Sequence, residues 1–400
     1  MSHQPHHNPI TKRPLIKIMR PRSPNEVHRA STPLELLFDL VFVVAIALAA
    51  ARLHHGIAEN HTAHAVLSFF MVFFPIWWAW MNFTWFASAY DIDDVPYRLL
   101  TMVQLTGALI MAAGVPKAFD VSDFTVITIG YLVMRLALVA QWLRAWRADP
   151  PRRKIITRYI VGLSIVQAGW IGLLLIPNEY KLIGFLLMVA LEMAVPVWSE
   201  SANAKQMTPF HREHIIERYG LLTIIVLGES ILSASNAMQG ALSNDQFNGS
   251  VLKIGIGGVL IVFSMWWTYF QQTEHKVAQS LESSFLWGYG HYFIFASAAA
   301  VGAGLSVAVD YATGVAHISS VVAGLAVAVP VAVFALSVGV VHGRIAVGGW
   351  MAVLFLSLIA ATLVTPWLPD SILWLGVIFA IFLGAMLWIN RGEEVASSHH

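Results

Sequence analysis

Long apolar runs, separated by short polar segments, fill the chain from residue 34 to residue 390. A helix needs about 20 apolar residues to cross the hydrocarbon core of a bilayer, and in lipid its backbone groups must bond within the helix. Twelve runs meet this requirement, so we expect twelve membrane-spanning helices. These runs cover residues 34–52, 65–89, 98–119, 123–146, 157–177, 181–198, 215–237, 251–271, 284–309, 318–341, 345–367 and 371–390.

The composition supports an all-α polytopic membrane protein. Hydrophobic residues make up 57% of the 400 residues, charged residues make up 12%, and the mean hydropathy is +0.66. An ordinary soluble domain has roughly 25% charged residues. The net charge of +1 gives no sign of a nucleic-acid partner, and the absence of cysteine excludes disulfides and thiolate metal sites. We expect one transmembrane domain over 31–390, between a basic, histidine-containing tail (1–30) and a short tail (391–400).

The basic residues predict the orientation of the spans. If both termini are cytoplasmic, nineteen Lys and Arg fall on the cytoplasmic side, four fall outside, and Arg135 lies within a span. The positive-inside rule favours this arrangement, in the inner membrane of a bacterium. The basic segment 144–158 then becomes a cytoplasmic loop, and we expect it to contact anionic lipid headgroups.

The two halves of the chain, 31–200 and 208–390, share an order of features. Glu35 and Glu217 open the first and seventh spans, and tryptophan pairs follow in the second and eighth, at Trp77 and Trp266. Six helices in each half would give both halves the same orientation, as in the parallel repeats of some transporters. We therefore predict an internal duplication.

Ionisable residues inside the spans gather toward the predicted cytoplasmic side. Such residues are costly in a membrane, and they face protein, water or a cation and not lipid. Spans ten to twelve have none within their apolar stretches, apart from terminal ones. The pattern predicts one polar cavity that opens to the cytoplasm. The candidate residues, which would bind substrate or protons, are Glu35, Asp39, Arg135, Glu192, His214, Glu217, Glu229 and His291.

The first span begins with two carboxylates, in TPLELLFDL. Thr32, Pro33 and Glu35 fit a capping box with proline at the first helical position, which is a sufficient structural reason for Glu35. Asp39 lies one turn further in, on the same face as Glu35, and no cap explains it. We expect Asp39 to have a partner.

The seventh span places His214, Glu217 and Glu229 within one arc of about 120°, at 100° per residue. Glu229 lies near the middle of the membrane, where a carboxylate costs at least a few kcal/mol (roughly 2.5–3.5). It could pair with Arg135, be protonated, or take part in ion or proton binding. A structural pair of Arg135 and Glu229 is the simplest expectation.

Other polar positions have structural interpretations. His211 and Glu213 fit a hydrated turn at the membrane surface. His291 fits a hydrogen bond between helices, although it could also be a ligand. The tryptophans of spans two and eight fit an interfacial belt, and stacking on a ligand is the alternative. These are Trp77, Trp78, Trp80, Trp85, Trp266 and Trp267, while Gly255, Gly257 and Gly258 fit close helix packing.

Three segments together resemble the bacterial low-temperature-requirement A family: TPLELLFDLVFV, YDIDDVPYR and HIIERYGLLTIIVLGESIL. The resemblance extends over roughly residues 30–390. It implies a multi-pass inner-membrane protein linked by name to growth in the cold, and it implies no reaction or substrate. The residues that match the family's motifs are Glu35, Asp39, His214, Glu217, Arg218, Gly220, Gly228, Glu229 and Ser230.

Three classes of function fit these features. A proton-coupled transporter of small solutes or ions is favoured by the duplication, the predicted cavity and the mid-membrane charges. A membrane-embedded enzyme is the alternative, with a divalent metal held by residues among Asp39, His214, Glu217 and His291. A non-catalytic protein for cold adaptation is a third hypothesis. The sequence has no P-loop, dinucleotide fingerprint or zinc-protease motif.

Overall fold

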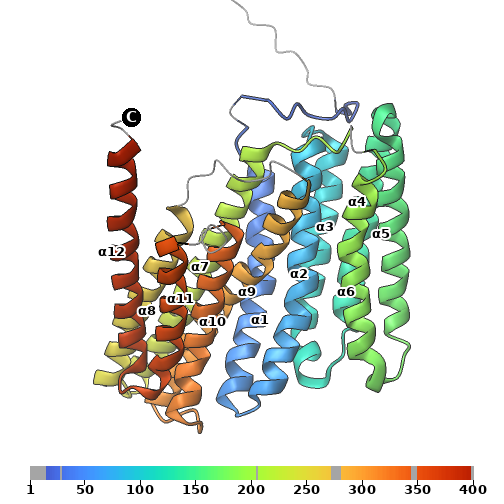
Figure 1. Cartoon of the computed structure of the whole chain (residues 1–400). Helices are drawn as coiled ribbons and strands as arrows, with labels where there is room; N and C mark the ends of the chain where they lie inside the picture. The colour runs from blue at the N-terminus through green and yellow to red at the C-terminus, as the bar shows by residue number, and fades with distance from the viewer. Residues whose placement is uncertain (1–14, 28, 204–205, 272–280, 344–348, 398–400) are drawn as a thin grey trace, which may run out of the picture.

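The computed structural model describes residues 15–27, 29–203, 206–271, 281–343 and 349–397, with only the backbone described for 281–282 and 390–397. This part of the chain is helical and contains no strand. Twelve of its helices are long and apolar enough to cross a membrane, which confirms the predicted number (Figure 1). The elements are α1 (Pro33–Ala58), α2 (Thr62–Tyr90), α3 (Val95–Val121), α4 (Thr125–Ala148), η1 (Pro150–Arg152), α5 (Arg153–Leu173), α6 (Asn178–Glu200), α7 (Arg212–Ser243), α8 (Gly249–Phe270), α9 (Leu281–Ala312), α10 (Ser320–Val341), α11 (Gly349–Val364), η3 (Thr365–Trp367) and α12 (Ser371–Ser397).

Several helices begin at a side chain that caps the first turn. Thr32 forms the predicted capping box: its Oγ1 accepts from Glu35 N at 3.3 Å, and the Glu35 carboxylate accepts from Thr32 N at 2.8 Å. Asp94 and Asn248 cap α3 and α8 in the same sense, by accepting from backbone N–H groups. Helices α1, α3 and α8 therefore start before their apolar runs, because the cap and not the hydrocarbon boundary determines where each begins.

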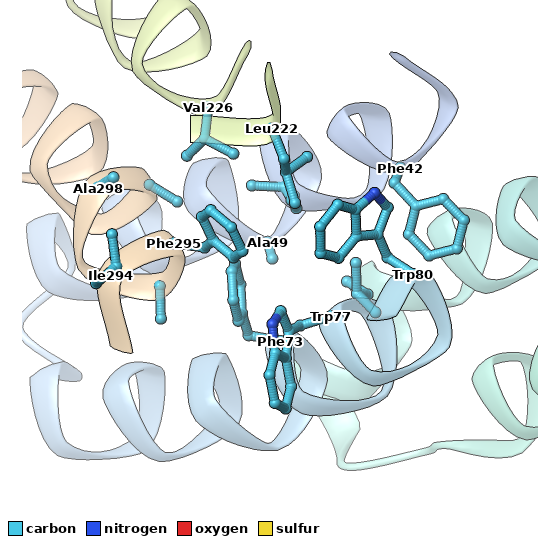
Figure 2. Close-up of a cluster of buried hydrophobic side chains, with 14 of the residues drawn as sticks. Phe42, Ala49, Phe73, Trp77, Trp80, Leu222, Val226, Ile294, Phe295 and Ala298 are labelled. Atoms are coloured by element: carbon cyan, nitrogen blue, oxygen red, sulfur yellow. The ribbon is translucent and has the colours of Figure 1, made fainter. Parts of the chain in front are cut away.

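The middle of the molecule is formed by α1, α2, α7 and α9. Helices α3 to α6 lie on one side of these four, and α8 and α10 to α12 lie on the other (Figure 1). Figure 2 shows side chains from the four central helices that meet in one apolar cluster, including Phe42, Trp80, Leu222 and Phe295. This core holds the two sides of the bundle together.

Glycines allow several helix pairs to pack at very short range. A Cβ on Gly107 would lie 2.6 Å from Gly130 O of the neighbouring helix α4, and one on Gly257 would lie 2.4 Å from Ile372 O of α12. Gly304 of α9 approaches Ala326 O of α10 in the same way. Small residues at helix interfaces are typical of membrane bundles, which lack a hydrophobic driving force between helices. The predicted packing role of Gly257 is confirmed.

Both described ends of the chain lie on the same face of the bundle (Figure 1). We call this the terminal face; it includes the segment 15–32 and the end of α12. The opposite face includes the α1–α2, α3–α4 and α9–α10 connections. The assignment of the terminal face to the cytoplasm stays a prediction, as does the duplication of the halves.

Reporter fusions test the orientation. We expect GFP fused after His400 to fluoresce and alkaline phosphatase fused there to be inactive, because the positive-inside rule retains the terminal face in the cytoplasm. Alkaline phosphatase inserted after Gly314, in the α9–α10 connection, is expected to be active. The reverse pattern at both sites would contradict the assignment.

Candidate functional site

Two helices bring four ionisable side chains together in what we call the α1–α7 cluster: Glu35, Asp39, His214 and Arg218. Arg218 Nη2 donates to Asp39 Oδ1, which also accepts from Trp80 Nε1 at 2.7 Å. His214 Nε2 lies 3.1 Å from Glu35 Oε1, and Arg218 Nη1 lies 3.7 Å from the same oxygen. All four side chains are at most 1% exposed.

Local sequence spacing explains this arrangement. Glu35 and Asp39 are four residues apart on α1, and His214 and Arg218 are four residues apart on α7, so each pair lies on one face of its helix. Asp39 has the partner that its position predicted. An unpaired buried charge would cost several kcal/mol (roughly 3–5), and pairing removes most of that penalty. The cluster therefore fixes α1 against α7.

The segment before α1 packs against the end of α2 on the terminal face. Arg29 is buried, and its guanidinium donates to Ala87 O and Ser88 O at the end of α2. Asp91, in the turn between α2 and α3, is 3% exposed. Burial raises the pKa of Asp91 to about 6, and the negative charge of Glu35 adds to the effect. The acidic turn YDIDDVPYR thus places a buried carboxylate, Asp91, near enough to Glu35 of the α1–α7 cluster to be affected by its charge.

A second group, the Glu192 cluster, lies within the first half of the chain. Glu192 of α6 accepts four hydrogen bonds: from Trp78 Nε1 (2.8 Å), Tyr131 OH (2.8 Å), Trp170 Nε1 (2.9 Å) and Arg135 Nη2 (2.6 Å). The donors come from α2, α4 and α5, and all five residues are at most 7% exposed. Four donors satisfy the accepting capacity of a carboxylate.

A cavity leads toward this cluster from the opposite face. This cavity, which we call the opposite cavity, has a volume of about 380 Å³ and lies between α2, α4, α5 and α6. Its lining includes Lys181 and Asp123, and also Tyr131 and Trp170, two of the donors to Glu192. Its volume is in the range of small-molecule sites, which span about 300–1,000 Å³.

A second cavity opens at the terminal end of the same four helices. The terminal cavity has a volume of about 60 Å³ and is lined by residues that include Asn82, Trp142, Pro196 and Tyr289. Helix α9 and the segment before α7 complete its wall.

The Glu192 cluster separates the two cavities. Along α2 the opposite cavity ends at Pro75 and the terminal cavity begins at Met81, with Trp78 between them. Along α6 the corresponding residues are Phe185 and Pro196, with Glu192 between them. The eleven-residue interval from Phe185 to Pro196 on α6 corresponds to a separation of about 16 Å along the helix between the two cavities. A fully buried charged barrier therefore lies between cavities that open on opposite faces.

The expected pair of Arg135 and Glu229 is wrong. Arg135 bonds to Glu192, whereas Glu229 is half-buried and accepts from Ser233 Oγ one turn along α7 at 3.2 Å. The single cavity open to the cytoplasm is wrong as well, because the candidates divide between separate places and neither cavity touches Asp39. Depth and helix face can be read from the sequence, but they do not specify which neighbouring helix a side chain meets.

The remaining candidates lie apart from both clusters. Glu217 is exposed and accepts from Ser31 N at 3.2 Å. His291 is fully buried, with Nδ1 2.7 Å from Trp287 O and Nε2 3.0 Å from Tyr269 OH, so it has the hydrogen bonds that its structural interpretation expected.

Two interfacial interpretations need correction. Glu213 is exposed as expected, but His211 is 4% exposed and is the N-cap of α7, where it accepts from His214 N. The three tryptophans at 77, 78 and 80 are at most 2% exposed and are core residues instead of a belt, while Trp266 and Trp267 are nearly half exposed. Trp77, Trp78 and Trp80 lie in the part of α2 that its neighbouring helices bury, from Val72 to Tyr90.

The described residues hold no group of three or more His, Asp or Glu side chains arranged for a metal ion. Asp39 and His214 share the α1–α7 cluster, whereas Glu217 faces the segment before α1 and His291 contacts Tyr269. The metal-binding hypothesis therefore gains no support from the geometry.

The sequence analysis did not predict that aromatic side chains would donate hydrogen bonds to Glu192. Trp78, Tyr131 and Trp170 together give Glu192 three of its four hydrogen bonds. Buried Tyr and Trp usually find a hydrogen-bond partner, so tryptophan and tyrosine inside spans two, four and five were the available signal. The identity of the partner could not be read from one helix.

The twelve long apolar helices of the described residues, together with the two buried clusters, define an integral membrane protein. The chain belongs to the family described as bacterial low temperature requirement A protein (LtrA), whose model matches residues 30–387. An uncharacterized protein of Rhizobium meliloti (strain 1021), RA0937, is 28% identical over 302 residues, which are 72% of this chain and 71% of that protein. No solved structure matches the chain.

The α1–α7 cluster predicts a large loss of stability in Arg218→Met. This variant leaves Asp39 without its cation, and breaking a buried pair costs about 3–5 kcal/mol. We expect a marked decrease in the midpoint temperature of thermal unfolding, measured in detergent by tryptophan fluorescence. The double variant D39N/R218M should recover part of the loss, because it leaves no unpaired carboxylate at Asp39.

Glu217→Gln is the matched control. Glu217 lies one residue from Arg218 but is exposed. The free energy of unfolding of Glu217→Gln should therefore stay within about 0.5 kcal/mol of that of the unaltered protein. Equal stability of Arg218→Met and Glu217→Gln would contradict the account of the cluster.

Proposed function

We propose that this protein transports a small solute or ion across the bacterial inner membrane, coupled to proton movement. In the proposed orientation both chain ends are cytoplasmic, so the terminal cavity opens inward and the opposite cavity opens outward. The observation that carries the proposal is the pair of cavities on opposite faces, which approach the same buried carboxylate, Glu192.

The arrangement matches what a transport path requires. Access from both faces has to reach one site, and that site must be closed in the resting state. Here α2, α4, α5 and α6 each contribute residues to both cavities, so the two openings are opposite ends of one helix group. Trp78, Tyr131 and Trp170 close the space around Glu192.

The chemistry of the barrier allows exchange of partners. Arg135 neutralises Glu192, and a proton or another cation that arrives from either cavity can take its place. Arg135 also has two buried nitrogens, Nε and Nη1, with no hydrogen-bond partner in the described part of the chain. An unsatisfied buried donor costs about 1–3 kcal/mol. Water or a substrate acceptor at these atoms would remove that cost.

We also propose that the segment 144–158 binds anionic headgroups. Arg144 and Arg152 are engaged with Asp94 and Asp149. Arg147, Arg153 and Lys154 are exposed at the terminal face, where each basic side chain near an anionic surface contributes about 1 kcal/mol.

Proton flux in proteoliposomes tests the transport proposal. A pH gradient is imposed, a set of small organic cations and anions is added outside, and an enclosed pH-sensitive dye reports coupled proton movement. We expect the unaltered protein to exceed empty liposomes with at least one solute. Glu192→Gln should decrease that flux at least tenfold, because it removes the exchangeable charge.

Two comparisons separate mechanism from damage. Arg135→Gln combined with Glu192→Gln removes both charges together and should also lack flux while leaving no unpaired buried charge. Glu229→Gln changes a carboxylate outside the path and should retain flux. Normal flux in Glu192→Gln, or no flux above empty liposomes with any solute, would contradict the proposal.

A further inference from the structure

The terminal cavity has an unusual lining. Seven of its fifteen lining residues are aromatic, and the described residues of the lining include no Lys, Arg or His. The aromatic residues are Trp85, Phe86, Trp142, Tyr159, Phe210, Phe285 and Tyr289. Aromatic faces carry negative partial charge and attract cations, most strongly where water is excluded.

The aromatic side chains support one another in the wall. Trp142 and Tyr159 stack with ring centroids 4.5 Å apart and an interplanar angle of 8°. Trp85 contacts Phe210 edge to face at 4.8 Å. Trp85 Nε1 donates to Tyr219 OH, and Tyr289 OH donates to Met193 O. These bonds hold the polar atoms of both rings in the protein.

Glu200 adds a full negative charge to this wall. It is 5% exposed and accepts from Tyr159 OH (2.9 Å), Thr208 N (3.0 Å) and Thr208 Oγ1 (2.6 Å). All three donors are neutral, and no described Lys, Arg or His nitrogen forms an ion pair with Glu200. Arg152, nearby in sequence to the stacked rings, pairs with Asp149 instead.

The position of Glu200 makes an external cation more favourable still. It is the last residue of α6, where the helix dipole places negative partial charge. Within the described parts of the chain, this buried carboxylate is held by neutral donors and has no ion-pair partner that would compensate its charge. The space beside it, about 60 Å³, exceeds the roughly 10–15 Å³ that one water needs.

We infer that the terminal cavity binds a small organic cation with an ammonium headgroup, held between aromatic faces and the Glu200 carboxylate. As an assignment of substrate class, the inference rests on the proposed transport function. As an assignment of a binding site it does not, and the experiment separates the two.

The experiment measures binding of choline to the full-length protein in a maltoside detergent by isothermal titration calorimetry. The comparison ligand is 3,3-dimethylbutan-1-ol, which has the shape of choline without its charge. We expect saturable binding of choline and binding of the neutral analogue at least tenfold weaker. This comparison uses the unaltered protein and does not depend on the folding of any variant.

Variants then locate the site. Glu200→Gln and Trp142→Leu should each weaken choline binding at least tenfold, while Trp266→Leu, which replaces an exposed tryptophan outside the cavity, should leave it unchanged. Absence of choline binding, equal binding of the neutral analogue, or unaltered affinity in folded Glu200→Gln would overturn the inference.

Glu192→Gln distinguishes failure of this inference from failure of the transport proposal. If choline binds and Glu192→Gln leaves coupled flux intact, the cation site stands and the proposed path is wrong. If choline does not bind but another solute gives flux that depends on Glu192, the path stands and the cation site is wrong.

Discussion

A charge buried among membrane helices must have its partner inside the protein, and this constraint organises the whole structure. Lipid offers neither counter-ions nor hydrogen bonds, so each buried acid fixes the helices that supply its donors. Asp39 fixes α1 against α7 through Arg218, and Glu192 fixes α6 against α4 through Arg135. Both pairs join segments far apart in the sequence, and together they determine how the apolar helices are placed.

The two clusters have different surroundings, which suggests different roles. The α1–α7 cluster joins α1 to α7, consists of four of the nine residues that match the family's motifs, and touches neither cavity. The Glu192 cluster lies between two cavities. We infer that the first holds the halves together and that the second is the functional barrier. The motif residues of this cluster would then stabilise the helix bundle and would not belong to the proposed transport path.

Much of the fold could be predicted from the sequence, because span length, caps and close-packing glycines are local properties. Thr32 and Glu35 show this well, since the capping box involves only neighbouring residues. The candidate site was predicted in part. Asp39 had its expected partner, but Arg135 bonds to Glu192 and not Glu229. Depth follows from counting residues, whereas a partner depends on helix packing, which one sequence does not specify.

Cysteine labelling tests most directly whether access from both faces meets at Glu192. The chain contains no cysteine, so Ser68→Cys and Asn82→Cys report single positions on α2, one in each cavity and about 21 Å apart along the helix. We expect a membrane-impermeant maleimide to label Ser68→Cys only from outside the cell and Asn82→Cys only from the cytoplasmic side of inverted vesicles. Labelling of both from the same side, or of neither until the protein is unfolded, would contradict the account.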